Sequence, residues 1–165
     1  MGVKLAHFYL KNCPGGRRMK EIKKILVPID FSDNSKKILK SARYVAEKFS
    51  AAISLIFVVQ SFEDYSGFFV PHLPLDKLAG EMLAGAQKKM ANFVEDNLED
   101  ITVQSLVVAG DVAEEILGYA EKEHMDLIIM GTHGYKGLER VLFGSIAEQV
   151  VKNSPCPILT INPYK

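Results

Sequence analysis

The stretch LIIMGTHGYKG, residues 127–137, decides the fold of this chain. Its first four residues are apolar without alternation, which is typical of a parallel strand that helices cover on both faces. Gly131 follows at once and allows the backbone to turn sharply where the strand ends. The stretch therefore predicts a buried parallel strand that opens into a glycine-rich loop.

Apolar runs of the same kind recur along the chain, and segments with a helical period separate them. The predicted strands cover residues 25–29, 53–59, 103–109, 127–130 and 158–161. The first helix is expected to bury a stripe from Ile38 to Phe49, and the second a stripe from Leu75 through Met82 to Phe93. The order βαβαβαβαβ predicts an α/β, doubly wound domain of three layers, with a five-stranded parallel sheet between helices.

The last two predicted helices begin at recognisable caps. Asp111 is the expected N-cap of a helix over residues 111–123, with Glu114 in the capping-box position. Ser145 is the expected N-cap of a short helix over residues 145–152.

The composition excludes several classes of protein. The chain has 165 residues, with 20 Lys and Arg against 20 Asp and Glu, so its formal net charge is zero. Proteins that bind nucleic acid or anionic lipid need an excess of positive charge, so neither is an expected partner. No apolar run reaches the roughly 18 residues of a membrane-spanning helix, and two cysteines do not make a disulfide scaffold. We expect a cytoplasmic protein in which Cys156 is an inert, packed thiol.

The first eighteen residues differ from the rest of the chain. Residues 1–18 have no amphipathic period, so we expect either a disordered extension or a segment that is not native, with Met19 as the true start. The folded domain is then residues 19–165.

One internal segment, residues 61–74, is long for a connection in a compact domain and rich in aromatic residues and proline. Its adjacent phenylalanines, Phe68 and Phe69, either cover a ligand or a partner protein, or pack on their own domain.

The loops after the first and fourth strands are the candidate site, because ligands of open parallel sheets bind beyond the carboxyl ends of the strands, where the strand order reverses. Asp30 ends the first strand, where its carboxylate either binds a ribose or a hydrated metal ion, or only begins the turn. Ser32 or Asp33 already serves as the cap of the next helix, and this redundancy favours the functional interpretation.

The glycines after the fourth strand are typical of a loop that binds an anion through its backbone. Gly134 lets main-chain N–H groups approach an anion, and Gly144 with Ser145 presents free N–H donors and a hydroxyl at the start of a helix. Together they predict a cradle for a polyphosphate. Lys136 and Arg140 either add positive charge to it or are solvated surface residues.

The same loop offers no evident catalytic group. His133 has no nucleophile or carboxylate partner at a telling spacing, so we expect it to contribute only its backbone. The Walker and G-x-G-x-x-G motifs are absent, as is the acid and lysine pattern of a phosphorylatable receiver domain. The cysteines and histidines lack metal-ligand spacing, so we expect no metal ligand from the protein.

The pattern Gly131-x2-Gly134-x9-Gly144-Ser145, preceded by LIIMG and followed by SPCPILTI, resembles the universal stress protein family, as does the opening KILVPIDFS. The resemblance covers essentially the whole predicted domain. It implies strand order 3-2-1-4-5 in a Rossmann-like, adenine-nucleotide-binding fold. It also implies a homodimer in which the fifth strand, residues 157–161, pairs with its copy. Because the whole glycine pattern is present, it implies the ATP-binding subgroup.

The resemblance further implies how a nucleotide lies. In ATP-binding members, backbone at the ends of the first two strands holds the adenine, and the phosphates follow the glycine loop with a divalent ion, Mg or Mn, between their oxygens. With ATP, ADP or AMP as ligand, the implied site consists of Pro28, Asp30, Val58, Met130, Gly131, Thr132, His133, Gly134, Tyr135, Lys136, Gly137, Gly144, Ser145, Ile146 and Ala147. Phe57 departs from the family, in which many members have His at this position.

Three functions remain open from the sequence. The expected one is a homodimeric, ATP-binding regulator of a stress response, in which nucleotide occupancy changes the glycine loop and a surface for an unidentified protein partner. The second is slow ATP hydrolysis or phosphoryl transfer, for which the loop shows no base and no metal-binding acid. The third is a nucleotide-free interaction module, which leaves the nine-residue interval and Ser145 unexplained. We assign no catalytic residue.

Overall fold

The computed structural model describes residues 7–9, 21–60, 75–98, 101–132 and 144–164. The strands in these ranges are β1 His7–Tyr9, β2 Lys24–Pro28, β3 Ala52–Gln60, β4 Gln104–Gly110, β5 Leu127–Gly131 and β6 Ile158–Ile161. The helices are α1 Asp33–Phe49, α2 Leu75–Leu98, α3 Val112–Lys122 and α4 Ser145–Asn153. Each of the five predicted strands is present within one residue of its predicted ends.

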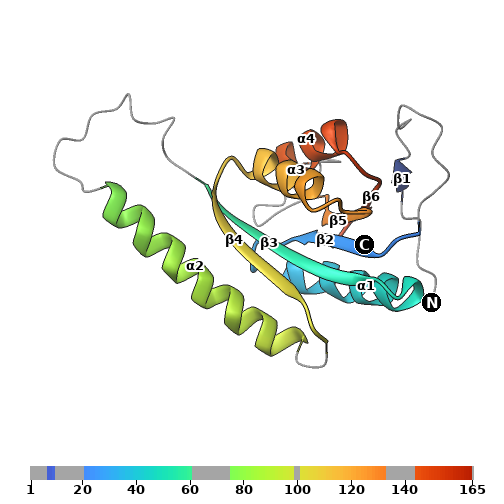
Figure 1. Cartoon of the computed structure of the whole chain (residues 1–165), viewed down its shortest axis with the longest axis horizontal. Coiled ribbons are helices and arrows are strands. Elements are labelled where there is room, and N and C mark those ends of the chain that lie inside the picture. Colours follow the sequence, from blue (N-terminus) through green and yellow to red (C-terminus); the bar gives the residue numbers. More distant parts are fainter. Residues whose placement is uncertain (1–6, 10–20, 61–74, 99–100, 133–143, 165) are drawn as a thin grey trace.

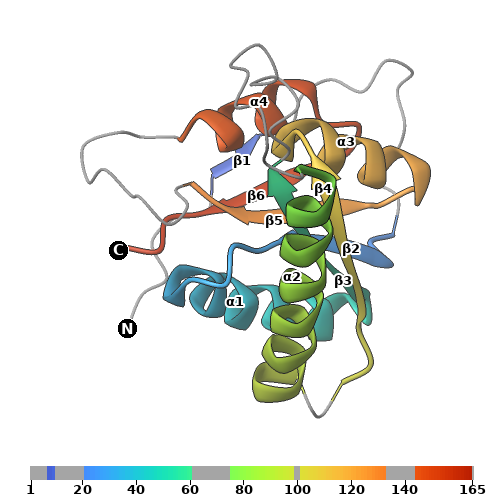
Figure 2. The same ribbon diagram turned by 90° about the vertical axis from the view of Figure 1, so that its left-hand side faces the viewer.

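The five predicted strands form a parallel sheet with β2 in the middle. The order is β6-β5-β2-β3-β4, which confirms the predicted order 3-2-1-4-5 once the parallel strands are numbered along the chain. Helices α1 and α2 cover one face, and α3 and α4 cover the other (Figures 1 and 2). The domain therefore has the predicted three layers of a Rossmann-like α/β fold.

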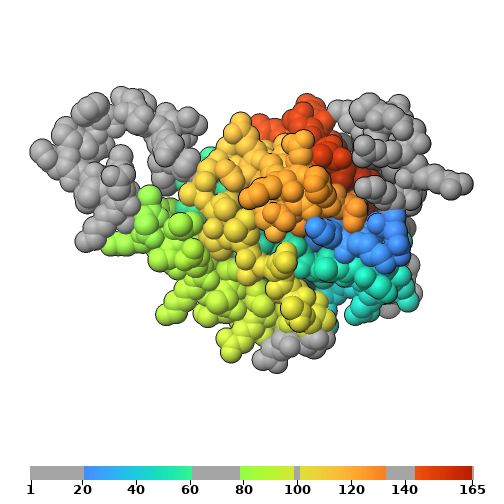
Figure 3. Space-filling model, in the orientation of Figure 1, coloured from blue at the N-terminus to red at the C-terminus, as the bar shows by residue number. Residues whose placement is uncertain are grey.

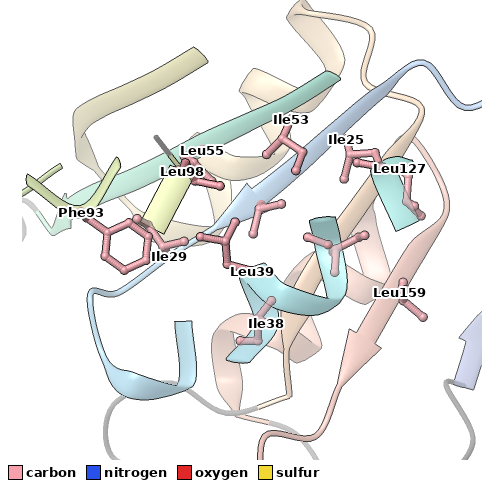
Figure 4. Packing of buried hydrophobic residues seen from close by; sticks show 14 of the residues in the cluster. Ile25, Ile29, Ile38, Leu39, Ile53, Leu55, Phe93, Leu98, Leu127 and Leu159 are labelled. Atoms are coloured by element: carbon pink, nitrogen blue, oxygen red, sulfur yellow. The ribbon is translucent and has the colours of Figure 1, made fainter. Parts of the chain in front are cut away.

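Both faces of the sheet are buried, which explains why the strands show no alternation of apolar and polar residues. On β2, Ile25 and Val27 pack toward α1 and α2, whereas Leu26 packs toward α3 and α4. Figure 4 shows the first of these clusters, where Leu39 of α1 and Phe93 of α2 approach side chains of the strands. A strand that must fill two cores has few positions for a polar side chain.

The helices bury less of their apolar stripes than expected. Phe49 and Met82, both predicted to be buried, are 45% and 39% exposed. Phe49 is the last residue of α1. For Met82 the reason is length: the 24 residues of α2 extend roughly 36 Å, whereas the seven residues of its neighbour β4 extend roughly 23 Å. Among the described side chains of α2, the buried ones begin at Ala86. The side chains of Leu75 and Leu78 lie outside the described residues.

A sixth strand was not expected. β1 pairs antiparallel with β6, with His7 opposite Thr160 and Tyr9 opposite Ile158. It belongs to residues 1–18, for which the sequence indicated no native element, and it occupies the β6 edge that was expected to pair with a second copy (Figure 1). The start at Met19 stays a prediction.

The surface is built from the same layers. In the space-filling view, α2 and the segment from β4 to α3 make up adjacent parts of one face (Figure 3). Among the described residues, none of the helices combines the length and the apolar character needed to cross a membrane. The expected loop 61–74, with Phe68 and Phe69, lies outside the described residues.

Candidate functional site

The strand order reverses at β2. From β2 the chain continues through α1 to β3 on one side, while β5 lies on the other side of β2. The Ile29 N–H donates to the carbonyl oxygen of Ile56 at 3.0 Å, so pairing with β3 continues past the end of β2. Continuing the registers of β2 with β3 and with β5 places Asp30 level with Val58 and Thr132. The predicted site residues at the ends of these strands therefore share one edge of the sheet.

Asp30 is held by hydrogen bonds from the turn that follows it. One carboxylate oxygen, Oδ1, accepts from the Ser32 N–H at 3.0 Å, from Ser32 Oγ at 2.5 Å and from Ser35 Oγ at 2.6 Å. The Asp30 N–H donates to Ser35 Oγ at 2.9 Å. Ser32 is also the N-cap of α1, as the sequence allowed, because its hydroxyl accepts from the Ser35 N–H.

The other oxygen of this carboxylate, Oδ2, is buried and has no hydrogen-bond partner in the described part of the chain. Buried polar atoms in native structures are nearly always paired, so an exception calls for a reason. A helix cap is not the reason, since Ser32 already serves α1. Asp30 lies at the end of the sheet where open parallel sheets bind ligands, so Oδ2 is a candidate acceptor for a ligand.

The residue after Asp30 has an unusual backbone conformation. Phe31 has φ 59°, in the left-handed region that bulky residues rarely adopt. Its ring lies 4.3 Å from that of Phe57 and 5.8 Å from that of Phe93, between centroids. These contacts anchor the turn that carries Asp30. They also explain Phe57, the departure from the family pattern, which packs against the core under α1 and α2.

The second half of the site joins β5 to α4. The Thr132 N–H donates to the Ile161 carbonyl at 2.9 Å, and the Gly144 N–H donates to the Thr132 carbonyl at 2.8 Å. Thr132 is buried, at 7% exposure. The first turn of α4 is thereby fixed against the end of β5, although eleven residues separate Thr132 from Gly144 in the sequence.

The helix α4 begins differently from the prediction. Its N-cap is Gly144, not Ser145, and no side chain among the described residues caps it. In α3, by contrast, the predicted cap is confirmed: Asp111 accepts from the Ala113 and Glu114 N–H groups at 2.9 and 3.0 Å. Ser145 is the first residue inside the helix and therefore follows the capping position. The first turn of α4 consequently keeps N–H groups that no side chain serves, at the positive end of the helix dipole.

Charge in the first turn of α4 is partly compensated. Glu148 forms an ion pair with Lys152, with a distance of 2.6 Å between carboxylate oxygen and ammonium nitrogen. The hydrogen bond and the positive charge of Lys152 lower the pKa of the Glu148 carboxyl. This pair reduces the repulsion that an anion at the start of α4 would meet from Glu148.

Several predicted site residues have buried side chains, and this limits the contacts that those residues can make with a ligand. Val58, Met130 and Ala147 are buried in the core under α3 and α4, and Ile146 packs against it. A ligand can reach only the backbone of such residues. Pro28 and Gly131 end their strands at the same edge.

Part of the prediction cannot be placed. His133, Gly134, Tyr135, Lys136 and Gly137 lie outside the described residues, and so does Arg140.

Sequence reasoning missed Ser35. It is 2% exposed and lies on the buried stripe of α1, three residues before Ile38 and four before Leu39. A polar residue at a position where the helical period demands an apolar one was the available signal.

The described residues hold no group of three or more His, Cys, Asp or Glu side chains that would bind a metal ion. Cys156 is partly buried and packs beside α4, with Ser154 Oγ 3.9 Å from its sulfur. A pocket of about 360 Å³, lined in part by Arg43, Glu47 and Thr102, adjoins the start of β3 and includes none of the predicted site residues.

Comparison with known proteins agrees with the fold. The model of the universal stress protein family matches residues 21–162. The chain is 38% identical over 148 residues to universal stress protein MJ0531 of Methanocaldococcus jannaschii, across 87% of this chain and 84% of the relative. It is 33% identical over 153 residues to universal stress protein MJ0577 of the same organism, across 84% of this chain and 94% of the relative.

Solved structures extend the agreement to three dimensions. The structure of MJ0577 superposes with a TM-score of 0.73 at 31% identity and covers 87% of this chain and 97% of its own. A universal stress protein in complex with cAMP shares the fold, with a TM-score of 0.63 at 19% identity, over 87% of this chain and 99% of its own. The chain therefore belongs to the universal stress protein family.

Proposed function

We propose that this universal stress protein binds an adenine nucleotide, ATP or its products ADP and AMP, at the edge of the sheet where β2 and β5 end. The observation that carries the proposal is the buried, unpartnered Oδ2 of Asp30 beside an uncapped helix N-terminus. Oδ2 is an acceptor that lacks a donor among the described residues, and the N–H groups at the start of α4 are donors that lack an acceptor there. A nucleotide has hydroxyl and amino donors at one end and phosphate acceptors at the other.

The two halves of the site define the orientation of the ligand. The nucleoside lies at Asp30 and against the backbone near Pro28 and Val58, because a carboxylate attracts neutral donors and repels phosphate. The phosphates lie at the first turn of α4, where free N–H groups and the helix dipole favour negative charge. Gly144 has no side chain of its own, and no side chain among the described residues caps this turn.

The glycine loop and a divalent ion complete the proposed site. The family resemblance implies that Thr132 to Gly137 lie beside the phosphates, where Lys136 would add a positive charge. Mg or Mn would neutralise phosphate charge, with phosphate oxygens and water as its ligands. The proposed role is binding, and slow hydrolysis is the alternative that the experiment below distinguishes.

Nucleotide occupancy would then act as a signal in a regulator that is homodimeric when β6 pairs with its copy instead of with β1. The end of β5, the glycine loop and α4 are consecutive in sequence, and Thr132 links them by hydrogen bonds to both β6 and Gly144. A ligand at 100 times its dissociation constant stabilises the protein by about 2.7 kcal/mol, which is enough to change the population of a loop conformation. The cAMP complex named above concerns another protein and, at 19% identity, supports the fold alone.

Release of bound ligand tests the proposal directly. We expect freshly purified full chain, when denatured, to release adenine nucleotide that absorbance and mass spectrometry identify, and the empty protein to gain thermal stability with Mg-ATP. Released ATP indicates binding with little turnover, whereas ADP or AMP indicates hydrolysis. Protein that releases nothing and whose melting temperature does not respond to ATP, ADP or AMP contradicts the proposal and favours a nucleotide-free interaction module.

A further inference from the structure

Ser35 is bonded to both the backbone and the side chain of Asp30. Its hydroxyl oxygen accepts from the Asp30 N–H at 2.9 Å and its hydroxyl donates to Asp30 Oδ1 at 2.6 Å. Ser35 is 2% exposed, so water does not compete for these bonds. A serine hydroxyl has one donor and two acceptor positions, so these contacts use its donor and at least one acceptor.

The three donors to Asp30 all converge on one oxygen. Ser32 contributes its N–H and its hydroxyl, and Ser35 contributes its hydroxyl, all to Oδ1. The two oxygens of a carboxylate are chemically equivalent until the surroundings distinguish them. Here the surroundings satisfy Oδ1 fully and leave Oδ2 buried without a partner among the described residues.

This asymmetry is not needed for the fold. The N-terminus of α1 already has Ser32 as its cap, and a buried acceptor without a donor lowers stability. A partial rotation of the carboxylate could share these donors between its two oxygens and relieve the deficit. The two contacts of Ser35 oppose that rotation, because one fixes the backbone of Asp30 and the other fixes its side chain.

We propose that Ser35 is a positioning residue of the nucleotide site, which holds Asp30 so that Oδ2 is the one acceptor offered to a hydroxyl or amino donor on the nucleoside part of the ligand. The inference rests on the proposed function and deepens it, because it assigns the discrimination among nucleosides to one oxygen atom. Phosphate is excluded as the group at Oδ2, since two anionic oxygens repel each other.

The test compares ligands that each lack one donor. The affinity of the full chain is measured by calorimetry for ATP, 2′-deoxy-ATP, 3′-deoxy-ATP and the triphosphate of purine riboside, which has no amino group. We expect at least one analogue to bind roughly tenfold more weakly than ATP, the effect of one hydrogen bond to a charged group. The analogue that does so identifies the donor as a ribose hydroxyl or as the amino group of adenine.

The variants separate positioning from folding. In Ser35→Ala the preference for ATP over that analogue should fall below about threefold, while affinity for the analogue itself changes little. Ser35→Thr, which keeps the hydroxyl, should restore the preference. Ser54→Ala removes a buried hydroxyl of β3 that none of these contacts uses, and it should keep the full preference. If Ser35→Ala does not fold, Ser35→Cys replaces it, since a thiol is a weaker donor of similar size.

Asp30→Asn tests the oxygen itself. Its carbonyl can accept the three donors now at Oδ1, and its amide group then presents N–H donors at the position of Oδ2. We expect this variant to bind ATP no better than the analogue.

The outcomes distinguish the two proposals. A wild-type chain that binds ATP but also binds all three analogues equally well overturns the role of Oδ2 and leaves nucleotide binding intact. A full preference in Ser35→Ala overturns the positioning role alone. A chain that binds none of the four nucleotides contradicts the proposed function and removes the basis of this inference with it.

Discussion

A residue of the candidate site combines strain with packing. Phe31 has a left-handed backbone, which costs an L-residue roughly 1–2 kcal/mol, and its ring contacts Phe57 and Phe93. The ring contacts offset the backbone cost and hold the turn between β2 and α1. Glycine would adopt this backbone without strain but would leave the turn without an anchor. The neighbouring carboxylate of Asp30 therefore depends on an aromatic cluster for its position.

Truncation of the ring tests this dependence. Phe31→Ala should lower the free energy of unfolding by roughly 1–3 kcal/mol, because it removes two ring contacts that contribute about 0.5–1.5 kcal/mol each. Urea denaturation followed by circular dichroism measures the change. Tyr44→Ala, which removes a ring that is 63% exposed, is the matched control and should change stability by less than about 1 kcal/mol. Equal losses in both variants would show that the Phe31 contacts do not stabilise the fold.

The two helices on the second face of the sheet begin in different ways. α3 is capped by Asp111, so its first N–H groups have partners within the protein. α4 begins at Gly144, and among the described residues no side chain caps its first turn. The α4 terminus is thus less stable than it would be with a side-chain cap, and it is also the terminus at the end of β5. We interpret this as stability given up for anion binding.

A side-chain cap on α4 should raise its stability and weaken the binding of an anion. Gly144→Asp places its Cβ about 3.5 Å from the Thr132 carbonyl, an ordinary contact, and the φ of −71° suits any residue. The carboxylate should stabilise α4 by about 0.3–1 kcal/mol while it weakens ATP binding at least tenfold, because it occupies the N–H groups and repels phosphate. Thermal denaturation and calorimetry measure the two effects.

The control for that variant is the opposite change in the neighbouring helix. Asp111→Ala should cost about 0.5–2 kcal/mol of stability and leave the affinity for ATP unchanged. If Gly144→Asp binds ATP as tightly as the wild type, the first turn of α4 is not where the phosphates lie.

At one side of the parallel sheet, the last parallel strand, β6, is covered by β1. β1 pairs antiparallel with β6 over three residue positions, and the family model begins only at residue 21. An uncovered edge strand presents unpaired N–H and C=O groups to any other strand. In this chain β1 occupies the same edge through which the resemblance implies dimerisation, so the two pairings exclude each other.

Deletion of residues 1–18 should therefore promote self-association. We expect the shortened chain to form more dimer than the full chain at equal concentration, as measured by light scattering after size-exclusion chromatography. A deletion of residues 1–6 alone, which keeps β1, is the matched control and should behave as the full chain does. Identical mass distributions for the three proteins would show that β1 does not compete with a second copy.

Much of this architecture follows from the sequence. Burial of the strands on two faces removes the alternation of polar residues, so the apolar runs predict parallel strands directly. Asp111 and Ser32 are recognisable as caps because capping uses residues close in sequence. Asp30 was predicted to be a site residue because it follows a buried strand and because Ser32 or Asp33 can cap the next helix in its place. Local chemistry, read along the chain, is sufficient for such features.

Other features exist only in the folded chain. Among the described residues, Oδ2 of Asp30 lacks a partner because three donors converge on Oδ1 in the turn. The start of α4 is fixed by the bond between Gly144 and Thr132, two residues that are not neighbours in the sequence. The pairing of β1 with β6 joins residues about 150 positions apart, a number that follows from His7 opposite Thr160. No local pattern encodes which atoms are left unsatisfied, because satisfaction depends on neighbours that distant parts of the chain supply. The sequence by itself determined the layers, the strand order through family resemblance, and the end of the sheet where we propose that a ligand binds. The tertiary structure decided which oxygen and which helix terminus the proposal uses, because both depend on contacts between distant parts of the chain.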